Sequence, residues 1–377
     1  MKFMHVVGAR PNFMKLAPLY KKIASSVHSQ KIIHTGQHYD SAMSDIFFEQ
    51  LQMPMPDYHL GVGSGSHTEQ TAKIMLGIEQ VLLQNRPDIM IVYGDINSTL
   101  AAALVCSKMQ IPIAHVEAGL RSGDRGMPEE INRILTDSIA DILLTPSQDG
   151  NDNLLREGIA ENKIHLVGNI MIDTLIDALE IIEKNKQLVH FADDILSKLK
   201  GNDFILSTVH RPSNVDKPEN LELLFKTLAT ISEQTEVILP LHPRTHKQLT
   251  DANILKKLPD SLHIVAPLGY FDFIYLQKNA FCILTDSGGI QEESSYLQTP
   301  CFTLRKNTER PITITLGTNE LIGDDYGLLL RKIMELKAKK SQKEISSTTA
   351  IPFWDGNTAT RILKVLEFMN NSIFNHP

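Results

Sequence analysis

Short apolar runs recur along the first half of the chain, and each is followed by a segment in which apolar residues have helical spacing. These runs are residues 3–8, 31–36, 89–94, 113–119, 142–147 and 164–168. An apolar run of this length that ends at turn-forming residues is typical of a buried strand. The regular alternation of strand and helix predicts a parallel sheet covered by helices, which is a doubly wound α/β domain.

The same alternation starts again after a long helical stretch at residues 171–199, with apolar runs at 204–210, 237–242, 262–267, 281–286 and 301–304. We therefore expect an α/β protein of two Rossmann-like doubly wound domains, residues 1–168 and 169–355, with the boundary near Gly168. Apolar residues at helical spacing in segment 356–377 predict a final helix that packs back on the first domain. Ligands of open parallel sheets bind beyond the carboxyl ends of the strands, so the site is expected in an inter-domain cleft.

Composition narrows the classes of partner. The chain has 377 residues, enough for two domains of ordinary size. Its net charge of -7 and pI of about 6.1 argue against nucleic acid or an anionic membrane as partner, because both require a basic surface. No apolar run approaches the roughly 18 residues that span a bilayer, and Arg10 follows the apolar start too soon for a secretory signal, so we expect a cytoplasmic protein. The widely separated Cys106, Cys282 and Cys301 predict buried thiols, without a disulfide framework or a zinc site.

The turn after the first predicted strand is a candidate phosphate site. Gly8 permits a tight turn, and Arg10 and Lys15 follow around the start of the next helix. Free N–H groups at a helix N-terminus together with nearby cations suit a diphosphate. The turn has neither a G-x-G-x-x-G nor a Walker pattern, which disfavours dinucleotide and ATP binding in those modes. A plain strand-to-helix turn with solvated cations is the alternative.

A second phosphate candidate follows the strand predicted at residues 281–286. Ser287, Gly288 and Gly289 open a helix whose first N–H groups are not obstructed by side chains. Glu292 and Glu293 come one turn later, where a carboxylate can accept both hydroxyls of a ribose. The alternative is that Ser287 only caps the helix and the glutamates favour its N-terminus.

Carboxylates are concentrated at the carboxyl edge of the first predicted sheet. Asp95 and Glu117 follow neighbouring strands and lie beside glycines, and Glu129 and Glu130 begin the next helix. Acids that converge at one edge of a sheet indicate general acid–base chemistry. We expect Glu130, by contrast, to lie in the solvated first turn of its helix.

Two histidines and two aromatic residues complete the candidates. His210 and His242 follow the first two strands of the second domain, and either can donate to a phosphate or to a leaving oxygen. Phe271 and Phe273 can stack on a base or belong to the core. The sequence has no H-E-x-x-H, H-x-H or acidic cluster at metal spacing, so we expect no metal and no other cofactor.

Seven short motifs occur in order along the chain: GARP at 8–11, TGQH at 35–38, YGD at 93–95, VEAGLR at 116–121, MPEEINR at 127–133, TDSGGIQEE at 285–293 and TERP at 308–311. Each is weak alone, but the ordered set covers nearly the whole chain and resembles the non-hydrolysing UDP-N-acetylglucosamine 2-epimerase family. The resemblance implies a glycosyltransferase-B-like fold, a UDP-sugar substrate and commonly a homodimer.

The resemblance also implies residue roles. The catalytic group would be Asp95, Glu117, Glu129 and His210. The substrate-binding group would be Arg10, Lys15, Phe273, Ser287, Gly288, Gly289, Glu293 and Arg310. In this family's chemistry, UDP is eliminated from the sugar to give a 2-acetamidoglucal and is then added back, so no NAD is required.

Two departures from the family pattern leave open whether a second UDP-sugar activates the enzyme and which sugar is the substrate. Where many bacterial members use an Arg-Gln pair to bind a second, activating UDP-sugar, this chain has Glu69 followed by Gln70. The loop between Arg121 and Pro128 is short, as in relatives that act on 2,3-diacetamido uronic acid sugars, which makes UDP-2,3-diacetamido-2,3-dideoxy-glucuronate the alternative substrate. A UDP-sugar glycosyltransferase and a non-catalytic UDP-sugar sensor are rivals of other classes, and neither has a use for the three acids.

Overall fold

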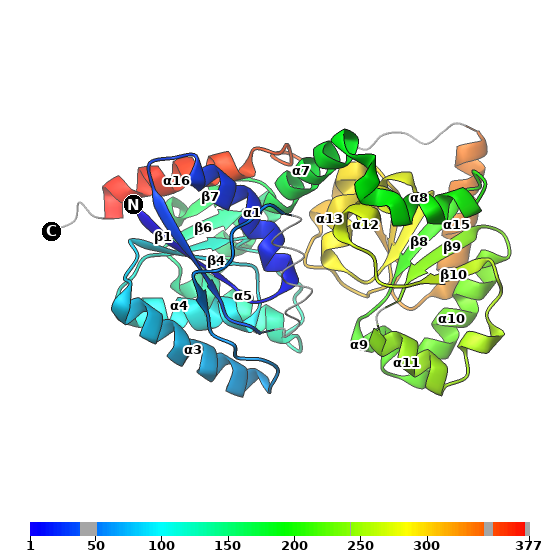
Figure 1. The fold of residues 1–377 in the computed structure, drawn as a ribbon, viewed down its shortest axis with the longest axis horizontal. Helices are drawn as coiled ribbons and strands as arrows, with labels where there is room; N and C mark the ends of the chain where they lie inside the picture. Colours follow the sequence, from blue (N-terminus) through cyan, green and yellow to red (C-terminus); the bar gives the residue numbers. More distant parts are fainter. Residues whose placement is uncertain (38–50, 242, 343–349, 374–377) are drawn as a thin grey trace. The chain divides into compact units, whose positions relative to one another are not determined.

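The structure is a computed structural model that describes residues 1–37, 51–241, 243–342 and 350–373. His38 and His242, named in the sequence analysis, lie outside the described residues. The chain divides into two compact units, which are coloured along the sequence in Figure 1. Unit 1 comprises Met1–Thr174 and Pro352–Pro377, and unit 2 comprises Leu175–Ile351. The division falls inside helix α7 (Ile170–Lys184), a little beyond Gly168.

Unit 1 is built on a parallel sheet with the strand order β3-β2-β1-β4-β5-β6-β7. Its strands are β1 (Lys2–Val7), β2 (Ser29–His34), β3 (Tyr58–His59), β4 (Ile89–Tyr93), β5 (Ile113–Val116), β6 (Ile142–Thr145) and β7 (Ile164–Leu166). Every apolar run predicted in this half overlaps one of these strands, which confirms the doubly wound fold. The pattern missed β3, because two residues are too short to show a periodicity.

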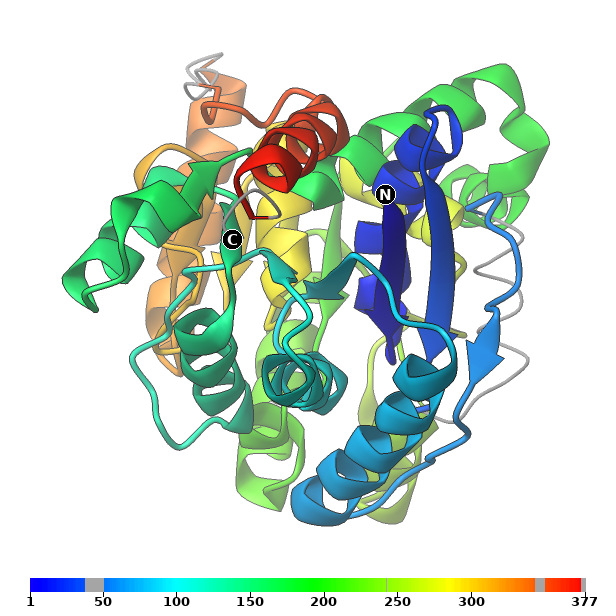
Figure 2. The same ribbon diagram turned by 90° about the vertical axis from the view of Figure 1, so that its left-hand side faces the viewer.

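Helices cover both faces of this sheet (Figure 2). They are α1 (Arg10–Ala24), α3 (His67–Gln84), α4 (Asn97–Met109), α5 (Pro128–Ile139), α6 (Gln148–Arg156) and α16 (Thr358–Ile373), with a 3-10 turn at Glu161–Lys163. Helix α4 packs between α3 and α5, and its buried Ala101, Ala102 and Ala103 allow this close approach. On the other face α16, red in Figure 1, packs against α1.

Specific contacts fix the last segment of the chain within unit 1. The Asp173 carboxylate accepts hydrogen bonds from the N–H groups of Thr358 (3.1 Å) and Ala359 (2.8 Å), and so caps the start of α16. The Trp354 indole donates to the Pro146 carbonyl at 3.0 Å. The apolar side of α16 is buried through Ile362, Leu363 and Leu366. The helical spacing seen in the sequence is therefore the spacing of a face that packs on the core.

Unit 2 repeats the architecture with the strand order β10-β9-β8-β11-β12-β13, all parallel. Its strands are β8 (Phe204–Thr208), β9 (Glu236–Pro240), β10 (Leu262–Val265), β11 (Cys282–Thr285), β12 (Cys301–Thr303) and β13 (Asn319–Leu321). The sequence pattern missed β13, an edge strand of three residues.

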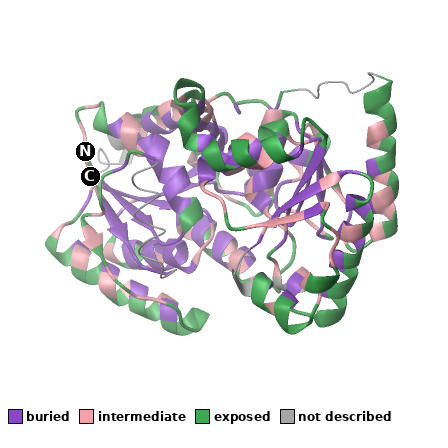
Figure 3. Ribbon diagram, turned by 45° about the vertical axis from the view of Figure 1, so that its right-hand side comes forward, coloured by how far each residue is buried: buried purple, intermediate pink, exposed green. Residues whose placement is uncertain are grey.

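The helices of unit 2 follow its strands in turn. They are α8 (His190–Lys198), α9 (Pro212–Val215), α10 (Pro218–Ser232), α11 (Pro243–Asp251), α12 (Tyr270–Asn279), α13 (Gly288–Leu297), α14 (Ile312–Thr315) and α15 (Tyr326–Ser341), with 3-10 turns at Lys186–Val189 and Leu255–Lys257. The central strands of both sheets, such as β4, β5, β8 and β11, are almost wholly buried (Figure 3), as expected for parallel sheets covered on both faces, whereas strands at the sheet edges are partly buried. Cys106, Cys282 and Cys301 are buried free thiols, as predicted. In the described part of the chain, none of the helices has the length and apolar character needed to cross a membrane.

Candidate active site

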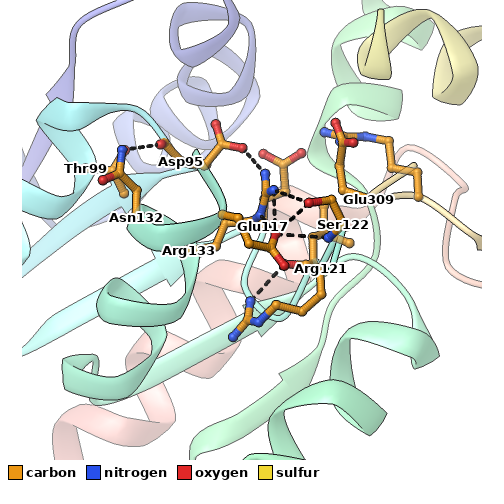
Figure 4. A network of polar contacts seen from close by, with 12 residues as sticks. Asp95, Thr99, Glu117, Arg121, Ser122, Asn132, Arg133 and Glu309 are labelled. Atoms are coloured by element: carbon orange, nitrogen blue, oxygen red, sulfur yellow. Dashed lines mark hydrogen bonds and ion pairs between the residues drawn. The ribbon is translucent and has the colours of Figure 1, made fainter. Parts of the chain in front are cut away.

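Asp95 lies in the turn between β4 and α4, at the carboxyl edge of the unit 1 sheet. Gly94 makes this turn with a φ of 61°. The Asp95 carboxylate forms an ion pair with Nη1 of Arg133, and its carbonyl accepts a hydrogen bond of 2.8 Å from Asn132 Nδ2 (Figure 4). Helix α5, which carries Asn132 and Arg133, therefore holds Asp95 through both its main chain and its side chain.

Glu117 follows the neighbouring strand β5, whose Val116 is in register with Tyr93 of β4. Its φ of 72° lies in the left-handed region, which costs an L-residue about 1–2 kcal/mol. Strained backbone of this kind is characteristic of functional sites, where the surroundings hold it in place. The Glu117 carboxylate is buried and forms an ion pair with Lys15 Nζ.

The ion pair between Lys15 and Glu117 explains the glycine at position 94. A Cβ at Gly94 would lie 2.7 Å from Lys15 Nζ and 3.1 Å from Glu117 Oε2. The turn after β4 must therefore lack a side chain for the pair to form. Arg10, the other cation predicted to bind the diphosphate, is exposed at the first position of α1.

Glu129 and Asp95 both line a cavity of about 260 Å³ within unit 1. Its polar lining also includes Gln37, His67, Gln70, Asn97 and Asn132. Glu129 is half-buried in the first turn of α5 and, among the residues that the structure describes, has no hydrogen-bond or ion-pair partner. A carboxylate placed in this way can take up or release a proton without first breaking an ion pair.

The prediction that Glu130 lies in a solvated turn is wrong. Glu130 is only 2% exposed. Its carboxylate accepts hydrogen bonds of 2.9 Å from the N–H groups of Ser122 and Gly123, and Arg133 donates to it from Nη2 at 2.7 Å and from Nε at 3.1 Å. Burial alone raises the pKa of Glu130, but the Ser122 and Arg133 hydrogen bonds outweigh it and hold this pKa below its usual range.

Arg133 is one of the residues of this site to which the sequence analysis gave no role. Its guanidinium is buried and bridges the Glu130 and Asp95 carboxylates. The loop that precedes α5 is thereby connected to the turn after β4. The sequence signal that could have indicated its role was the spacing of Glu130 and Arg133, which are three residues apart and so lie on one face of the helix.

Asp286 organises the corresponding edge of the unit 2 sheet. It is fully buried and accepts hydrogen bonds from the N–H groups of His210 (3.0 Å) and Arg211 (2.9 Å) and from Asn214 Nδ2 (2.9 Å). The His210 ring lies 3.0 Å away through Nδ1, and about half of its side chain is exposed. Burial raises the pKa of Asp286, but hydrogen bonding and charge from His210 outweigh it and keep this pKa low. Asp286 thus orients His210 and leaves its other edge accessible.

Helix α13 begins directly after Asp286 with the predicted phosphate seat. Ser287 is the N-cap residue, but its side chain makes no capping hydrogen bond. A Cβ at Gly289 would meet no heavy atom of the described residues within 4 Å, whereas one at Gly288 would lie 2.8 Å from Glu309 Oε1 and 3.0 Å from Arg310 Nη1. The first turn of α13 is therefore open at Gly289, where its N–H groups suit an anion, and is bordered at Gly288 by the Arg310–Glu309 ion pair.

Arg310 is held by two buried carboxylates. Its Nε lies 2.8 Å from Glu292 Oε1, and its Nη1 donates to Glu309 Oε1 at 2.8 Å. Arg305 donates to the other oxygen of Glu309, also at 2.8 Å. Burial raises the pKa of Glu309, but the charges of Arg310 and Arg305 lower it far below its usual range. The guanidinium is thus fixed at the start of α13 before any ligand binds.

The two remaining predicted contacts lie nearby in unit 2. Glu293 is buried and accepts hydrogen bonds from Gln277 Nε2 (2.7 Å) and the Tyr270 hydroxyl (3.3 Å). Phe273 of α12 is half-buried, while Phe271 belongs to the buried interior. Among the described residues, no group of three or more His, Cys, Asp and Glu side chains is arranged to hold a metal ion.

Comparison with known proteins agrees with this architecture. The family model of UDP-N-acetylglucosamine 2-epimerases matches residues 21–367. The UDP-N-acetylglucosamine 2-epimerase of Methanocaldococcus jannaschii is 44% identical over 373 residues, which are 98% of this chain and 99% of the relative. The UDP-2,3-diacetamido-2,3-dideoxy-D-glucuronate 2-epimerase of Pseudomonas aeruginosa is 42% identical over 329 residues, which are 86% of this chain and 88% of the relative.

The solved structures extend the match to the fold. The crystal structure of the M. jannaschii enzyme in complex with UDP-GlcNAc and UDP has a TM-score of 0.88 at 44% identity, covering 98% of this chain and 100% of that one. Two parallel-sheet α/β units of this type define the glycosyltransferase-B-like class. The chain belongs to the UDP-N-acetylglucosamine 2-epimerase family, whose members are isomerases.

Proposed function

We propose that this protein inverts the C2 configuration of UDP-N-acetylglucosamine to give UDP-N-acetylmannosamine. The observation that carries the proposal is the group of Asp95, Glu117 and Glu129 at one edge of the unit 1 sheet, in a chain of this family. Relatives at 44% and 33% identity carry the name UDP-N-acetylglucosamine 2-epimerase, which supports the choice of sugar.

Carboxylates suit this reaction because the C2 proton of the sugar is not next to a carbonyl. Direct removal of that proton would therefore face a very high barrier. In the proposed route a carboxylate takes the C2 proton, the C–H electrons form the C1=C2 double bond, and the C1–O electron pair leaves with UDP. UDP then adds back to C1 while a proton is delivered to the opposite face of C2. Acid–base chemistry on two faces calls for more than one carboxylate.

The proposed roles follow the two units. In unit 1 the acid–base groups are Asp95, Glu117 and Glu129, with Arg10 and Lys15 as cations for the diphosphate. In unit 2 the start of α13, with Ser287, Gly288, Gly289 and Arg310, receives phosphate, and His210 donates to the leaving oxygen. Glu293 binds the ribose, and Phe273 contacts the uracil. Negative charge that develops on UDP is stabilised by groups already oriented for it.

UDP-2,3-diacetamido-2,3-dideoxy-glucuronate is the second candidate substrate. The short loop between Arg121 and Pro128 and the 42% identity to the P. aeruginosa enzyme favour it. Supplying the two sugars separately to the purified protein and measuring kcat/KM for each discriminates between them. A higher kcat/KM for the diacetamido uronate would make that sugar the substrate, while the proposed reaction, inversion at C2, would stay the same.

We also propose that the protein forms a homodimer, which light scattering would test, and that it is located in the cytoplasm, which cell fractionation would test.

The carboxylates provide the test of the mechanism. Asp95→Asn, Glu117→Gln and Glu129→Gln are each expected to lower kcat by about 100-fold or more, since loss of one acid–base group typically costs 10²–10⁴-fold. UDP affinity, measured by calorimetry, should stay within about threefold of wild type, because these residues act on the sugar. Undiminished turnover in all three variants would remove the mechanism.

A further inference from the structure

Two buried polar residues beneath the acids belong to none of the roles above. His115 lies within β5 and Asp137 within α5, and both are at most 1% exposed. The His115 ring and the Asp137 carboxylate are 2.6 Å apart, from Nδ1 to Oδ1. Buried polar groups are retained where their hydrogen bonds are fully used, so the further partners of each residue matter.

His115 reaches the turn that carries Asp95. Its Nε2 lies 2.8 Å from the carbonyl oxygen of Gly94, the residue directly before Asp95. The carbonyl oxygen of Gly94 and the carboxylate of Asp137 can each accept a hydrogen bond from the ring, so both ring nitrogens of His115 have a buried partner. Each hydrogen bond fixes the ring, and the ring fixes the peptide group between Gly94 and Asp95.

Asp137 reaches the turn that carries Glu117. Its Oδ2 accepts hydrogen bonds from the Gly119 N–H at 3.1 Å and from Arg121 Nη1 at 2.7 Å. Burial raises the pKa of Asp137, but the neighbouring His115 and Arg121 outweigh it and hold this pKa low. The carboxylate is thus ionised and saturated with donors, which makes it a rigid anchor for the Gly119 turn.

The Gly119 turn needs such an anchor because its backbone is unusual. Glu117 has a φ of 72° and Gly119 a φ of 80°. A Cβ at Gly119 would lie 2.4 Å from the Gly150 carbonyl oxygen, so the turn is also pressed against α6. The N–H groups of Glu117 and Ala118 both donate to the Leu144 carbonyl, at 3.0 and 3.1 Å. The conformation that presents the Glu117 carboxylate is therefore held from several sides.

We propose that His115 and Asp137 are positioning residues that set the separation of the Asp95 and Glu117 carboxylates by joining the turns at Gly94 and Gly119. This role rests on the proposed function, in which those carboxylates are two of the three acid–base groups that act at C2. A displacement on the order of 1 Å at such a site can cost 100-fold in rate.

The test is Asp137→Asn, compared with Asp141→Asn. An amide at 137 keeps one acceptor but turns an N–H₂ group towards the donors of Gly119 or His115. Asp141 is a matched control because it accepts a 3.0 Å hydrogen bond from the Ile113 N–H at the other end of the same strand. Asp137→Asn is expected to lower kcat by at least about tenfold with little change in KM, and Asp141→Asn to behave as wild type.

A second readout separates positioning from stability. The number of C2 deuterium exchanges per epimer formed in D2O does not depend on how much enzyme is folded, because both come from folded molecules. If the carboxylates lose their spacing, this ratio should rise at least about threefold in Asp137→Asn, since inversion needs both groups and exchange does not. An unchanged ratio, with kcat reduced only by the fraction unfolded, would overturn the proposal.

If Asp137→Asn does not fold, the ratio of C2 exchange to epimer formation is measured in His115→Gln instead and compared with that of wild type. A changed ratio in His115→Gln supports the positioning role. If both variants are obtained only as unfolded protein, the pair is a folding element and the proposal is overturned. Absence of any exchange in the wild-type protein would instead contradict the proposed function, and is distinguishable because it appears without a substitution.

Discussion

The ammonium group of Lys15 and the carboxylate of Glu117 form a buried ion pair at the carboxyl edge of the unit 1 sheet, with both side chains less than a tenth exposed. The two residues are 102 positions apart in the sequence, and the pair fills the space that a side chain at Gly94 would occupy. A residue expected to bind diphosphate thus also sets the charge around a proposed catalytic acid. Stability and catalysis are coupled at this point.

The first prediction concerns this coupling. Lys15→Met leaves the Glu117 charge without this buried partner, so it should destabilise the fold by about 3–5 kcal/mol, the usual cost of breaking a buried pair from one side. Adding Glu117→Gln should restore part of that loss, and a double-mutant cycle in urea should give a coupling energy above about 1 kcal/mol. Strictly additive effects would mean that the ion pair does not hold these residues.

Glu130 gives a prediction about pH. Its pKa is lower in the folded protein than the ordinary value of 4.5, so its ionised form stabilises the fold above that pH. The contribution is lost as the pH falls through the folded pKa. Glu130→Gln should therefore be less stable than wild type at pH 7 by on the order of 2 kcal/mol, and the difference should shrink below pH 4.5.

Urea unfolding over a pH series measures this difference. Glu79→Gln, at an exposed position of α3, is the control and should stay within about 0.5 kcal/mol of wild type throughout. A Glu130→Gln difference that is as large at pH 3 as at pH 7 would show that packing, and not the charge of Glu130, is responsible.

The third prediction tests the phosphate seat at α13. Gly289→Ala places a methyl group in open space, so thermal stability should not change, whereas UDP affinity should fall about tenfold if phosphate approaches the first turn. Gly288→Ala brings a Cβ within 2.8 Å of Glu309 Oε1 and should lower both affinity and stability. Calorimetry with UDP and a thermal melt distinguish the two. Unchanged UDP affinity in Gly289→Ala would place the diphosphate elsewhere.

The sequence predicted the two parallel sheets because each strand is a buried apolar run that ends at a turn. Short edge strands escaped it: β3 and β13 have two and three residues and only a partly buried pattern. Asp95 and Glu117 could be placed at one edge because parallel strands expose their carboxyl ends together. Their partners could not be predicted, since the contacts of Lys15 and Arg133 depend on tertiary packing.

Glu130 shows most clearly what could not be predicted from the sequence. Acidic residues in the first turn of a helix normally face water and favour the helix dipole, which led to the wrong expectation. In the structure a loop folds over that turn and presents two N–H groups to the carboxylate. The His115 and Asp137 pair was missed for the same reason, because its partners belong to two separate turns.

The central claim is that this protein makes the C2 proton of a UDP-sugar labile by eliminating UDP. The most direct test is to incubate the purified protein with UDP-N-acetylglucosamine in D2O and to follow the sugar by proton NMR. Deuterium at C2 in both the gluco and the manno epimer is the predicted result. Complete retention of the C2 proton, with this sugar and with the diacetamido uronate, would contradict the account.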